Sequence, residues 1–161
     1  MDGNLQLVLE SSNPQGEEAT RLLLALRAES RGRYEDVISE STPPPRSMPL
    51  GTHSALLLAR LEGRVVGCAA LHPVEDGVAE VRRVYVAPSF RRQGIARRLL
   101  TALEQVASQR GYAVLRLETG TRQPEAIALY ESLGFHRIPA YGCHVGDPLS
   151  VCFEKRVNGS A

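Results

Sequence analysis

Tryptophan is absent from this 161-residue chain, and aromatic residues make up only 5% of it. Proteins that hold single-stranded nucleic acid stack its bases on aromatic side chains, and proteins that bind the phosphate backbone need a broad basic face. The formal net charge is only +1. We therefore expect no nucleic-acid partner.

Long hydrophobic runs are also missing. No apolar stretch approaches the roughly 20 residues that cross a bilayer, and Met1–Asn4 has neither the basic nor the apolar region of a signal peptide. We therefore expect a cytoplasmic protein without a membrane partner.

Cysteine is scarce, with residues only at positions 68, 143 and 152. An odd number without metal-ligand spacing argues against both a disulfide framework and a zinc site, and we expect no metal cofactor. Cys68 and Cys152 lie in apolar, strand-like runs and are interpreted as core residues. Cys143 lies in a glycine-containing loop and is the thiol to test for reactivity.

The residues that are present predict one domain over 1–161, since 43% of them are hydrophobic and the chain is long enough to bury a core. Asn13 and Pro14 predict the cap and first turn of a first helix, which should end near Gly32. A stretch rich in proline and serine from Ser39 to His53 predicts a surface loop. Apolar periodicity predicts strands over Leu5–Leu9, Ala55–Leu61, Arg64–Leu71, Val78–Val86, Ala113–Glu118, Phe135–Ile138 and Leu149–Arg156, and helices from near Gly94 and from Pro124.

The order of these elements predicts a mixed α/β sheet with helices on both faces. Short turns at Glu62–Gly63 and Glu75–Gly77 make the three strands between residues 55 and 86 antiparallel. The strand at 113–118 is reached by a helical crossover, which makes it parallel to the strand at 78–86.

The stretch Arg91-Arg92-Gln93-Gly94-Ile95-Ala96 lies between a strand-like run and a strongly amphipathic helix. The first N–H groups of a helix lack intrahelical partners and can bind a phosphate. Gly94 and Ala96 keep the inner surface of the turn small, so a diphosphate could approach the amides. We interpret residues 91–96 as an anion-binding turn. The chain has no G-x-x-x-x-G-K-[ST] and no complete G-x-G-x-x-G, which argues against a nucleotide-binding enzyme.

Positive charge is concentrated around that turn. Residues 81–98 contain six arginines and no acidic residue, which leaves a net charge of −5 on the rest of the chain. The planar fork of arginine donates two parallel hydrogen bonds to a phosphate, so this patch favours a ligand with several phosphate groups. The alternative for Arg82 and Arg98 is that they only solvate an exposed surface.

Three patterns then follow in order: Val84-Tyr85-Val86-x-Pro88, Arg91-x-x-Gly94-x-Ala96 and Ala126-x-x-Leu129-Tyr130-x-x-x-Gly134-Phe135. Together they resemble the GNAT superfamily of acetyl-CoA-dependent acyltransferases, whose signatures are Q/R-x-x-G-x-G/A and N-x-x-A-x-x-L-Y-x-x-x-G-F. From Ala55 to Arg156, the order of the predicted elements is similar to that of the superfamily. Other segments resemble a bacterial subgroup of the superfamily whose substrates are unknown. The chain departs from the family at Gln123, where Asn is frequent, and at Ala96, which replaces the last glycine.

This resemblance implies a mainly antiparallel sheet of about six or seven strands with a splayed pair of parallel strands. It implies acetyl-CoA as cosubstrate, with the pantetheine arm between the splayed strands, the diphosphate on the anion-binding turn, and an N–H near Val86 facing the thioester carbonyl. The cofactor-binding residues that it implies are Val84, Tyr85, Val86, Arg91, Arg92, Gln93, Gly94, Ile95, Ala96, Arg97 and Gln123.

Two catalytic residues are implied by their positions. Glu80 matches a glutamate frequent in the family and could accept the proton of the attacking amine. Its alternative is a salt bridge with Arg82 or a neighbouring arginine. Tyr130 matches the family tyrosine that assists the departing thiolate, and its alternative is an ordinary core aromatic beside Ile127 and Leu133.

The implied activity is acetyl transfer to a primary amine, on a small molecule or a peptide, by direct attack in a ternary complex. The alternative is a catalytically inactive acyl-CoA-binding sensor. Specificity is expected from two variable walls, Arg31–His53 and Ala140–Pro148. We expect the protein to be a monomer or a homodimer. Candidate acceptor-facing residues are Tyr34, Glu118, Tyr141, Cys143 and His144.

Overall fold

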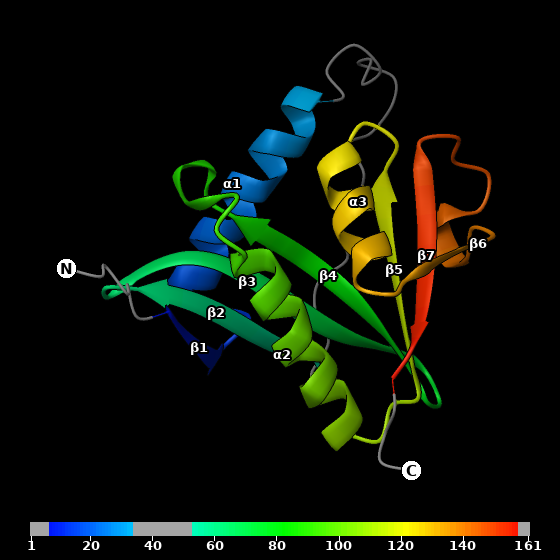
Figure 1. The fold of residues 1–161 in the computed structure, drawn as a ribbon, viewed down its shortest axis with the longest axis horizontal. Coiled ribbons are helices and arrows are strands. Elements are labelled where there is room, and N and C mark those ends of the chain that lie inside the picture. Colours follow the sequence, from blue (N-terminus) through cyan, green and yellow to red (C-terminus); the bar gives the residue numbers. More distant parts are fainter. Residues whose placement is uncertain (1–6, 34–52, 158–161) are drawn as a thin grey trace.

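Seven strands and three α-helices follow one another in the computed structural model, which describes residues 7–33 and 53–157 (Figure 1). The strands are β1 (Leu7–Ser12), β2 (Ala55–Leu61), β3 (Arg64–Glu75), β4 (Val78–Val86), β5 (Val114–Gly120), β6 (His136–Ile138) and β7 (Ser150–Arg156). The helices are α1 (Glu17–Arg33), α2 (Ile95–Gln109) and α3 (Pro124–Ser132), with short 3-10 turns η1 (Pro88–Phe90) and η2 (Gly142–His144). No helix within the described ranges has both the length and the apolar character to span a membrane.

The strands form one sheet in the order β1-β2-β3-β4-β5-β7-β6. Its described neighbours are antiparallel except for β4 and β5, which the crossover through α2 makes parallel. Tight turns join β2 to β3 and β3 to β4, and Gly63 and Gly77 adopt φ values of 80° and 76° there, which a residue with a Cβ rarely does. The expected α/β sheet with one parallel pair is confirmed.

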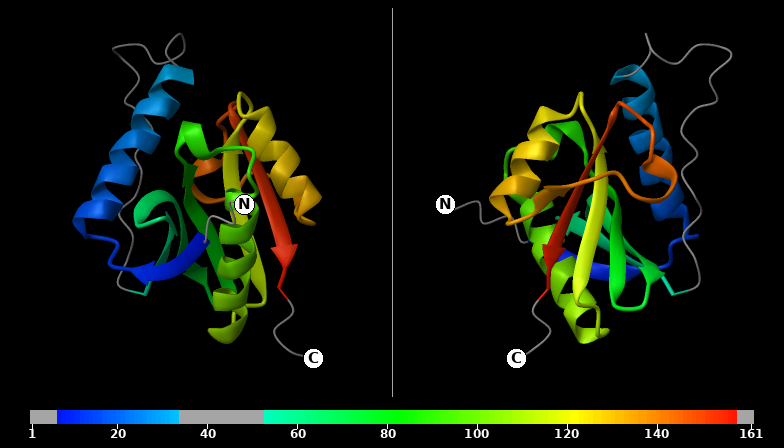
Figure 2. Two further views of the ribbon diagram at one scale, coloured as in Figure 1. Left: turned by 60° about the vertical axis from the view of Figure 1, so that its left-hand side comes forward. Right: turned by 90° about the vertical axis from the view of Figure 1, so that its right-hand side faces the viewer.

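The two faces of the sheet carry different helices. Along β2, Leu57 and Ala59 pack in the hydrophobic cluster that contains the buried side of α2, while Leu56 and Leu58 pack against α1, as the alternation of a strand requires. Tyr130 of α3 lies in the α2 cluster. Helices α2 and α3 therefore cover one face and α1 covers the other (Figure 1, Figure 2).

Helix α2 is amphipathic, as its spacing predicts. Full burial of a leucine contributes about 1.5–3 kcal/mol, so its apolar side fixes the helix, and with it the anion-binding turn, against the sheet. The chain leaves the helix through Gly111, with a φ of 84°. The buried residues of α2 are Ile95, Leu99, Leu100, Leu103 and Ala107.

The predicted cap of the first helix is wrong. The Asn13 side chain accepts a hydrogen bond from the Gln15 N–H at 3.0 Å, its carbonyl accepts one from the Gly16 N–H, and α1 begins only at Glu17. The reason is that an Asn-Pro pair also favours a turn, in which the asparagine oxygen bonds to the backbone two residues later.

Other boundaries differ by a few residues. Helix α1 continues past Gly32 to Arg33, and β3 continues past Leu71 to Glu75. The loop predicted between Ser39 and His53 lies outside the described residues except for His53 itself.

Candidate functional site

The parallel strands β4 and β5 pair over only four residues each. Val78–Val81 lies beside Val114–Leu117, although β4 continues to Val86 and β5 to Gly120. Figure 1 shows the two strands diverging beyond this point. We call the place where the pairing ends, after Val81 and Leu117, the fork. Beyond it the described part of β5 does not pair with β4, so this edge of β4 could accept an extended ligand as an added strand.

A β-bulge bends β4 just beyond the fork. In the ladder with β3, Arg83 and Val84 together oppose the single residue Ala69. Arg83 has a φ of 55°, which is uncommon for a residue other than glycine. Because an extra residue increases the local twist and bends the strand, the bulge accounts for the divergence of β4 from β5.

The anion-binding turn follows η1, just beyond the end of β4. Arg92 and Gly94 have φ values of 63° and 79°. The Arg98 N–H donates to the Gly94 carbonyl at 3.1 Å, so the N–H groups before it have no carbonyl within α2. A Cβ at Gly94 would meet no atom within 4 Å, which leaves open space beside the backbone. The turn therefore fits a diphosphate.

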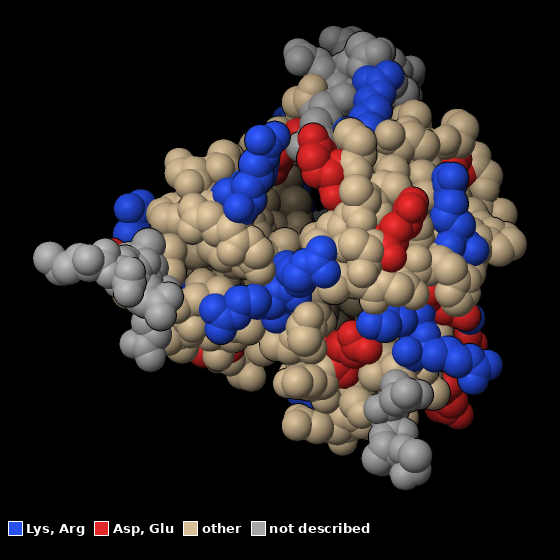
Figure 3. Space-filling model, in the orientation of Figure 1, with Lys and Arg blue, Asp and Glu red and all other residues tan. Residues whose placement is uncertain are grey.

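Figure 3 shows a hollow on this side of the molecule, between the η1–α2 connection and α3, with basic and acidic side chains at its rim. Of the predicted cofactor-binding residues, Arg92, Gln93, Gly94 and Arg97 are exposed. Arg97 also donates to the Ser132 hydroxyl at 2.7 Å and so joins α2 to α3. These exposed residues border the turn that would take the phosphate groups.

Arg91 has a structural partner on each side. Its Nε donates to the Val86 carbonyl at 2.8 Å, and another guanidinium nitrogen lies 2.6 Å from a Glu29 carboxylate oxygen. The side chain thus ties the end of β4 to α1. Tyr85 packs against α1 and Ile95 lies in the core, so these two could serve a ligand only through their backbone.

The remaining predicted cofactor-binding residues lie in β4, in α2 and just before α3. Val84 and Val86 belong to β4 beyond the fork, and Ala96 lies in the first turn of α2. Gln123 immediately precedes α3, and its N–H donates to the Gly120 carbonyl at 3.1 Å. The structure brings all of these to the side of the molecule where the strands diverge.

Tyr130 of α3 is 6% exposed. Its ring centroid lies 5.9 Å from that of Phe135 and 6.2 Å from that of Phe153. Burial raises the pKa of Tyr130, with a smaller contribution from the charge of Glu118. The hydroxyl is therefore protonated at neutral pH and can donate a hydrogen bond. The ring also fills the role of a core aromatic, and the catalytic role stays a prediction.

The Glu80 carboxylate, on β4 at the fork, has three partners. The Tyr141 hydroxyl donates to it at 2.6 Å, Arg82 Nε lies 3.5 Å away and His144 Nε2 lies 3.9 Å away. Burial raises the pKa of Glu80, but these partners together lower it by more. The salt bridge with Arg82 is present, and a carboxylate with a lowered pKa is a weak base. Glu80 as the proton acceptor stays a prediction.

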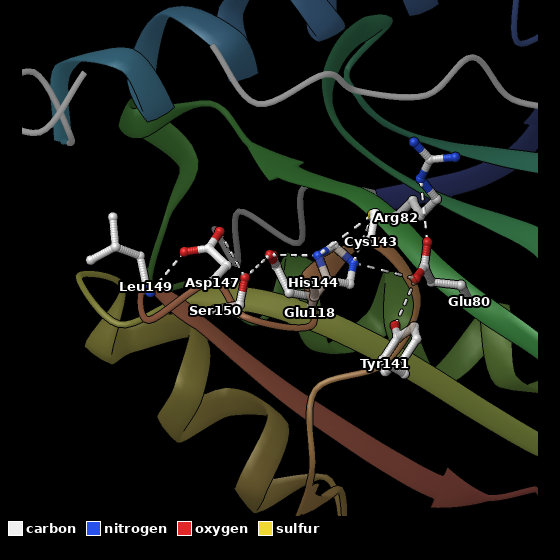
Figure 4. Close-up of polar contacts among 9 residues, drawn as sticks. All are labelled: Glu80, Arg82, Glu118, Tyr141, Cys143, His144, Asp147, Leu149 and Ser150. Carbon is white, nitrogen blue, oxygen red and sulfur yellow. Dashed lines mark hydrogen bonds and ion pairs between the residues drawn. The ribbon is translucent and has the colours of Figure 1, made fainter. Parts of the chain in front are cut away.

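Glu118, on β5 across the fork, completes a linked cluster (Figure 4). His144 Nδ1 lies 3.1 Å from Glu118, and the Ser150 hydroxyl donates to the same carboxylate at 2.8 Å. Contacts with Glu118, and then with Glu80, raise the pKa of His144 to about 10. His144 is therefore cationic at neutral pH and forms an imidazolium bridge between the two strands.

Sequence reasoning placed Tyr141 and His144 in the acceptor wall, and the structure brings both to Glu80. Cys143 is exposed, with its Sγ 3.9 Å from the ring nitrogens of His144. Tyr34 lies outside the described residues. The partnership of Arg91 with Glu29 was missed, because nothing local in a sequence marks a contact between residues 62 positions apart.

A separate pocket lies at the other end of α2, lined by His53, Ser54, Arg110 and Tyr112. Helix α2 has 15 residues and is therefore about 22 Å long. The pocket is far from the anion-binding turn and is not part of the candidate site.

The sequence model of the Acetyltransferase (GNAT) family matches residues 22–135 of the chain. A curated relative, an IAA acetyltransferase of Azospirillum brasilense, is 44% identical over 100 residues, which make up 62% of this chain and 65% of the relative. The chain thus aligns with slightly less than two thirds of the length of that relative.

Solved structures resemble the whole fold. A protein from Klebsiella pneumoniae, named as a "putative acyl-CoA N-acyltransferase", has a TM-score of 0.79 at 35% identity, over 96% of this chain and 99% of that one. A GNAT family acetyltransferase from Elizabethkingia anophelis with acetyl-CoA bound has a TM-score of 0.67 at 20% identity, over 93% of this chain and 97% of that one, and supports the fold alone. Because the family model covers more than half of the chain and the Klebsiella protein nearly all of it, the chain belongs to the GNAT acetyltransferase family.

Proposed function

We propose that the protein is an N-acetyltransferase that moves an acetyl group from acetyl-CoA to a primary amine, on a small molecule or a peptide, by direct attack in a ternary complex. The fork carries this proposal, because β4 pairs with β5 only as far as Val81 and continues to Val86. An extended ligand with amide groups, such as the pantetheine arm, fits such an edge as an added strand. The match to the Acetyltransferase (GNAT) family model supports the same ligand class here.

The cosubstrate would be held mainly by backbone groups. The N–H groups of residues 92–97 at the start of α2 would bind the diphosphate, and the exposed Arg92 would add a positive charge. Main-chain groups of Val84 and Val86 would pair with the amides of the pantetheine arm. A main-chain N–H near Val86 would stabilise the negative charge that forms on the thioester oxygen during attack.

The attacking amine must lose a proton, since a lysine-like amine with a pKa of about 10.4 is mostly protonated at neutral pH. Glu80 and Glu118 on the two sides of the fork would attract the ammonium form. Glu80 is the proposed proton acceptor, directly or through water. Tyr130 would donate a proton or a hydrogen bond to the departing thiolate, because a thiol is a stronger acid than a phenol.

We further propose that residues 1–161 form one domain that acts in the cytoplasm, as a monomer or a homodimer. The continuous seven-stranded sheet supports the single domain. The reaction as written needs no metal, and we propose no nucleic-acid or membrane partner.

Calorimetry with acetyl-CoA, followed by an assay of CoA release with a panel of amines, tests this function. Binding together with amine-dependent release is the expected result. Binding without release for any amine would favour the acyl-CoA-binding sensor. The absence of any heat of binding would contradict both functions.

A matched pair of glycine variants locates the diphosphate. Gly94→Leu adds a side chain beside the anion-binding turn, and Gly63→Leu adds the same side chain in the β2–β3 turn. Both glycines have a φ near 80° and open space around a Cβ, so both variants bear a similar backbone strain of about 1–2 kcal/mol. We expect acetyl-CoA affinity to fall by about tenfold or more in Gly94→Leu alone. Equal affinity in the two variants would place the diphosphate elsewhere.

A further inference from the structure

Arg83 has a buried Nε atom without a hydrogen-bond partner. Across residues 7–33 and 53–157, no other buried side-chain nitrogen or oxygen is in this state. A buried donor left unpaired destabilises the folded state, and a charged one does so more. Such an atom in a native protein needs an explanation, and a ligand that supplies the missing acceptor is one.

Other half-buried arginines of this protein have carboxylate partners. The pairs are Arg60 with Glu10 and Glu18, Arg82 with Glu80, Arg91 with Glu29, and Arg116 with Glu75 and Glu154. Within the described ranges Arg83 has no such pair. Burial first, and then repulsion from Arg82 and Arg27, lower the pKa of Arg83. Within residues 7–33 and 53–157, no carboxylate therefore balances its positive charge.

The base of the Arg83 side chain is held in place by the bulge, two residues beyond the end of the β4–β5 pairing. The Cys68 thiol donates to the Arg83 carbonyl at 3.1 Å. A Cβ at Gly67 would come within 2.7 Å of the Tyr85 carbonyl oxygen, so β3 and β4 lie in close contact here. These contacts maintain the uncommon φ of 55° and fix where the side chain leaves the strand, beside the fork.

Arg83 faces the side of the sheet that carries α1, since Arg27 of that helix is among its electrostatic neighbours. Glu80 and Glu118 face the same side, because the residues next to them in their strands pack in the α2 cluster. A molecule that reaches the fork from this side meets the two carboxylates, which His144 bridges, and then Arg83 farther along β4.

We propose that Arg83 binds a carboxylate group of the acceptor, so that the substrates are amines that also carry a carboxylate. This inference rests on the proposed acetyl transfer. Glu80 at the fork and Arg83 both belong to β4, three positions apart, so we place the amine and the carboxylate on one acceptor molecule. The planar fork of arginine matches the two oxygens of a carboxylate, which would also accept the hydrogen bond that Arg83 Nε lacks.

Acetyl transfer to matched amines, with and without a carboxylate, tests the inference. Suitable pairs are phenylalanine with phenethylamine and lysine with cadaverine. Arg83→Met keeps an unbranched stem and removes the charge, and Arg21→Met, at an exposed arginine of α1, is the control. We expect Arg83→Met to lower kcat/KM for the carboxylate-bearing members by about tenfold to hundredfold, mainly through KM. The amines without a carboxylate, and Arg21→Met with all substrates, should stay within about threefold of the wild type.

Two further measurements test the role of Arg83 even if the variant folds poorly or the protein shows no turnover. Arg83→Met removes an unpaired buried donor, so its Tm should be unchanged or raised, whereas a structural role for Arg83 predicts a lower Tm. In the presence of CoA, N-acetylphenylalanine should bind the wild type more tightly than N-acetylphenethylamine, and Arg83→Met should abolish the difference. This readout needs no turnover.

Two results would overturn the inference and leave acetyl transfer intact. One is an equal loss for both members of a substrate pair in Arg83→Met, and the other is a carboxylate preference that survives in that variant. A wild-type protein that releases no CoA with any amine would instead overturn the proposed function, and the product-binding comparison would then decide the role of Arg83 by itself.

Discussion

Tyr130 has a buried ring and a hydroxyl group, and one substitution tests the hydroxyl group alone. Its ring packs beside Phe135 and Phe153, and its hydroxyl is the proposed donor to the departing thiolate. Tyr130→Phe keeps the ring and removes the hydroxyl. We expect kcat to fall about a hundredfold or more, the low end of what a general acid contributes, while acetyl-CoA affinity measured by calorimetry stays unchanged.

A control at the other end of α2 makes this result specific. Tyr112 is half-buried and lines the separate pocket, so Tyr112→Phe removes a hydroxyl far from the fork and should leave kcat unchanged. If Tyr130→Phe behaves like Tyr112→Phe, Tyr130 is a core aromatic and another group assists the thiolate.

At the scale of an element, residues 139–149 are attached to the sheet by charge, and the attachment should depend on pH. The pKa of His144 is raised to about 10, against about 6.5 in an unfolded chain. The folded state binds this proton more tightly, so the stabilisation is fully present below pH 6.5 and is lost as the pH rises through 10. The lowered pKa of Glu80 affects stability at acidic pH. The stabilisation by Glu80 is present above about pH 4.5 and is lost as the pH falls below that value.

Thermal melts of His144→Gln over a pH range test this attachment. Near pH 6 the variant should melt about 2–4 °C below the wild type, as expected for a loss of about 1 kcal/mol. The difference should disappear toward pH 11. His136→Gln, at an exposed histidine of β6, should show no such trend. A constant difference across the range would mean that the positive charge of His144 is not what holds the segment.

The elements of this fold could be predicted because their signals are local. The apolar spacing of α2 and the left-handed residue at Gly111 each lie within a few residues of the structure that they determine. Asn13 was misjudged because its neighbours favour a turn as well as a cap.

The contacts of the site could not be predicted in this way. The bond from Tyr141 to Glu80 joins residues 61 positions apart, and the bulge at Arg83 depends on how β3 packs against β4. Such features are set by tertiary packing, and only the resemblance to a family pointed to the region where they lie.

At the scale of the whole molecule, the sheet consists of two parts with a short direct connection. Strands β1–β4 form one antiparallel part and β5–β7 form the other, and four residue pairs between β4 and β5 join them. On one face the bond from Arg97 to Ser132 links α2 to α3, and on the other His144 links Glu80 to Glu118. A ligand between the strands beyond the fork would join the same two parts.

Acetyl-CoA should therefore stabilise the molecule as a whole and protect the open edge of β4. At a concentration of 100 times Kd, binding contributes about 2.7 kcal/mol, which should raise Tm by about 5–10 °C for a chain of this size. Hydrogen exchange should be faster in the part of β4 beyond the fork than in the paired segment Val78–Val81, and acetyl-CoA should slow it. Gly63→Leu should keep both effects and Gly94→Leu should lose them. A rise in Tm without slower exchange beyond the fork would mean that the ligand binds somewhere other than between β4 and β5.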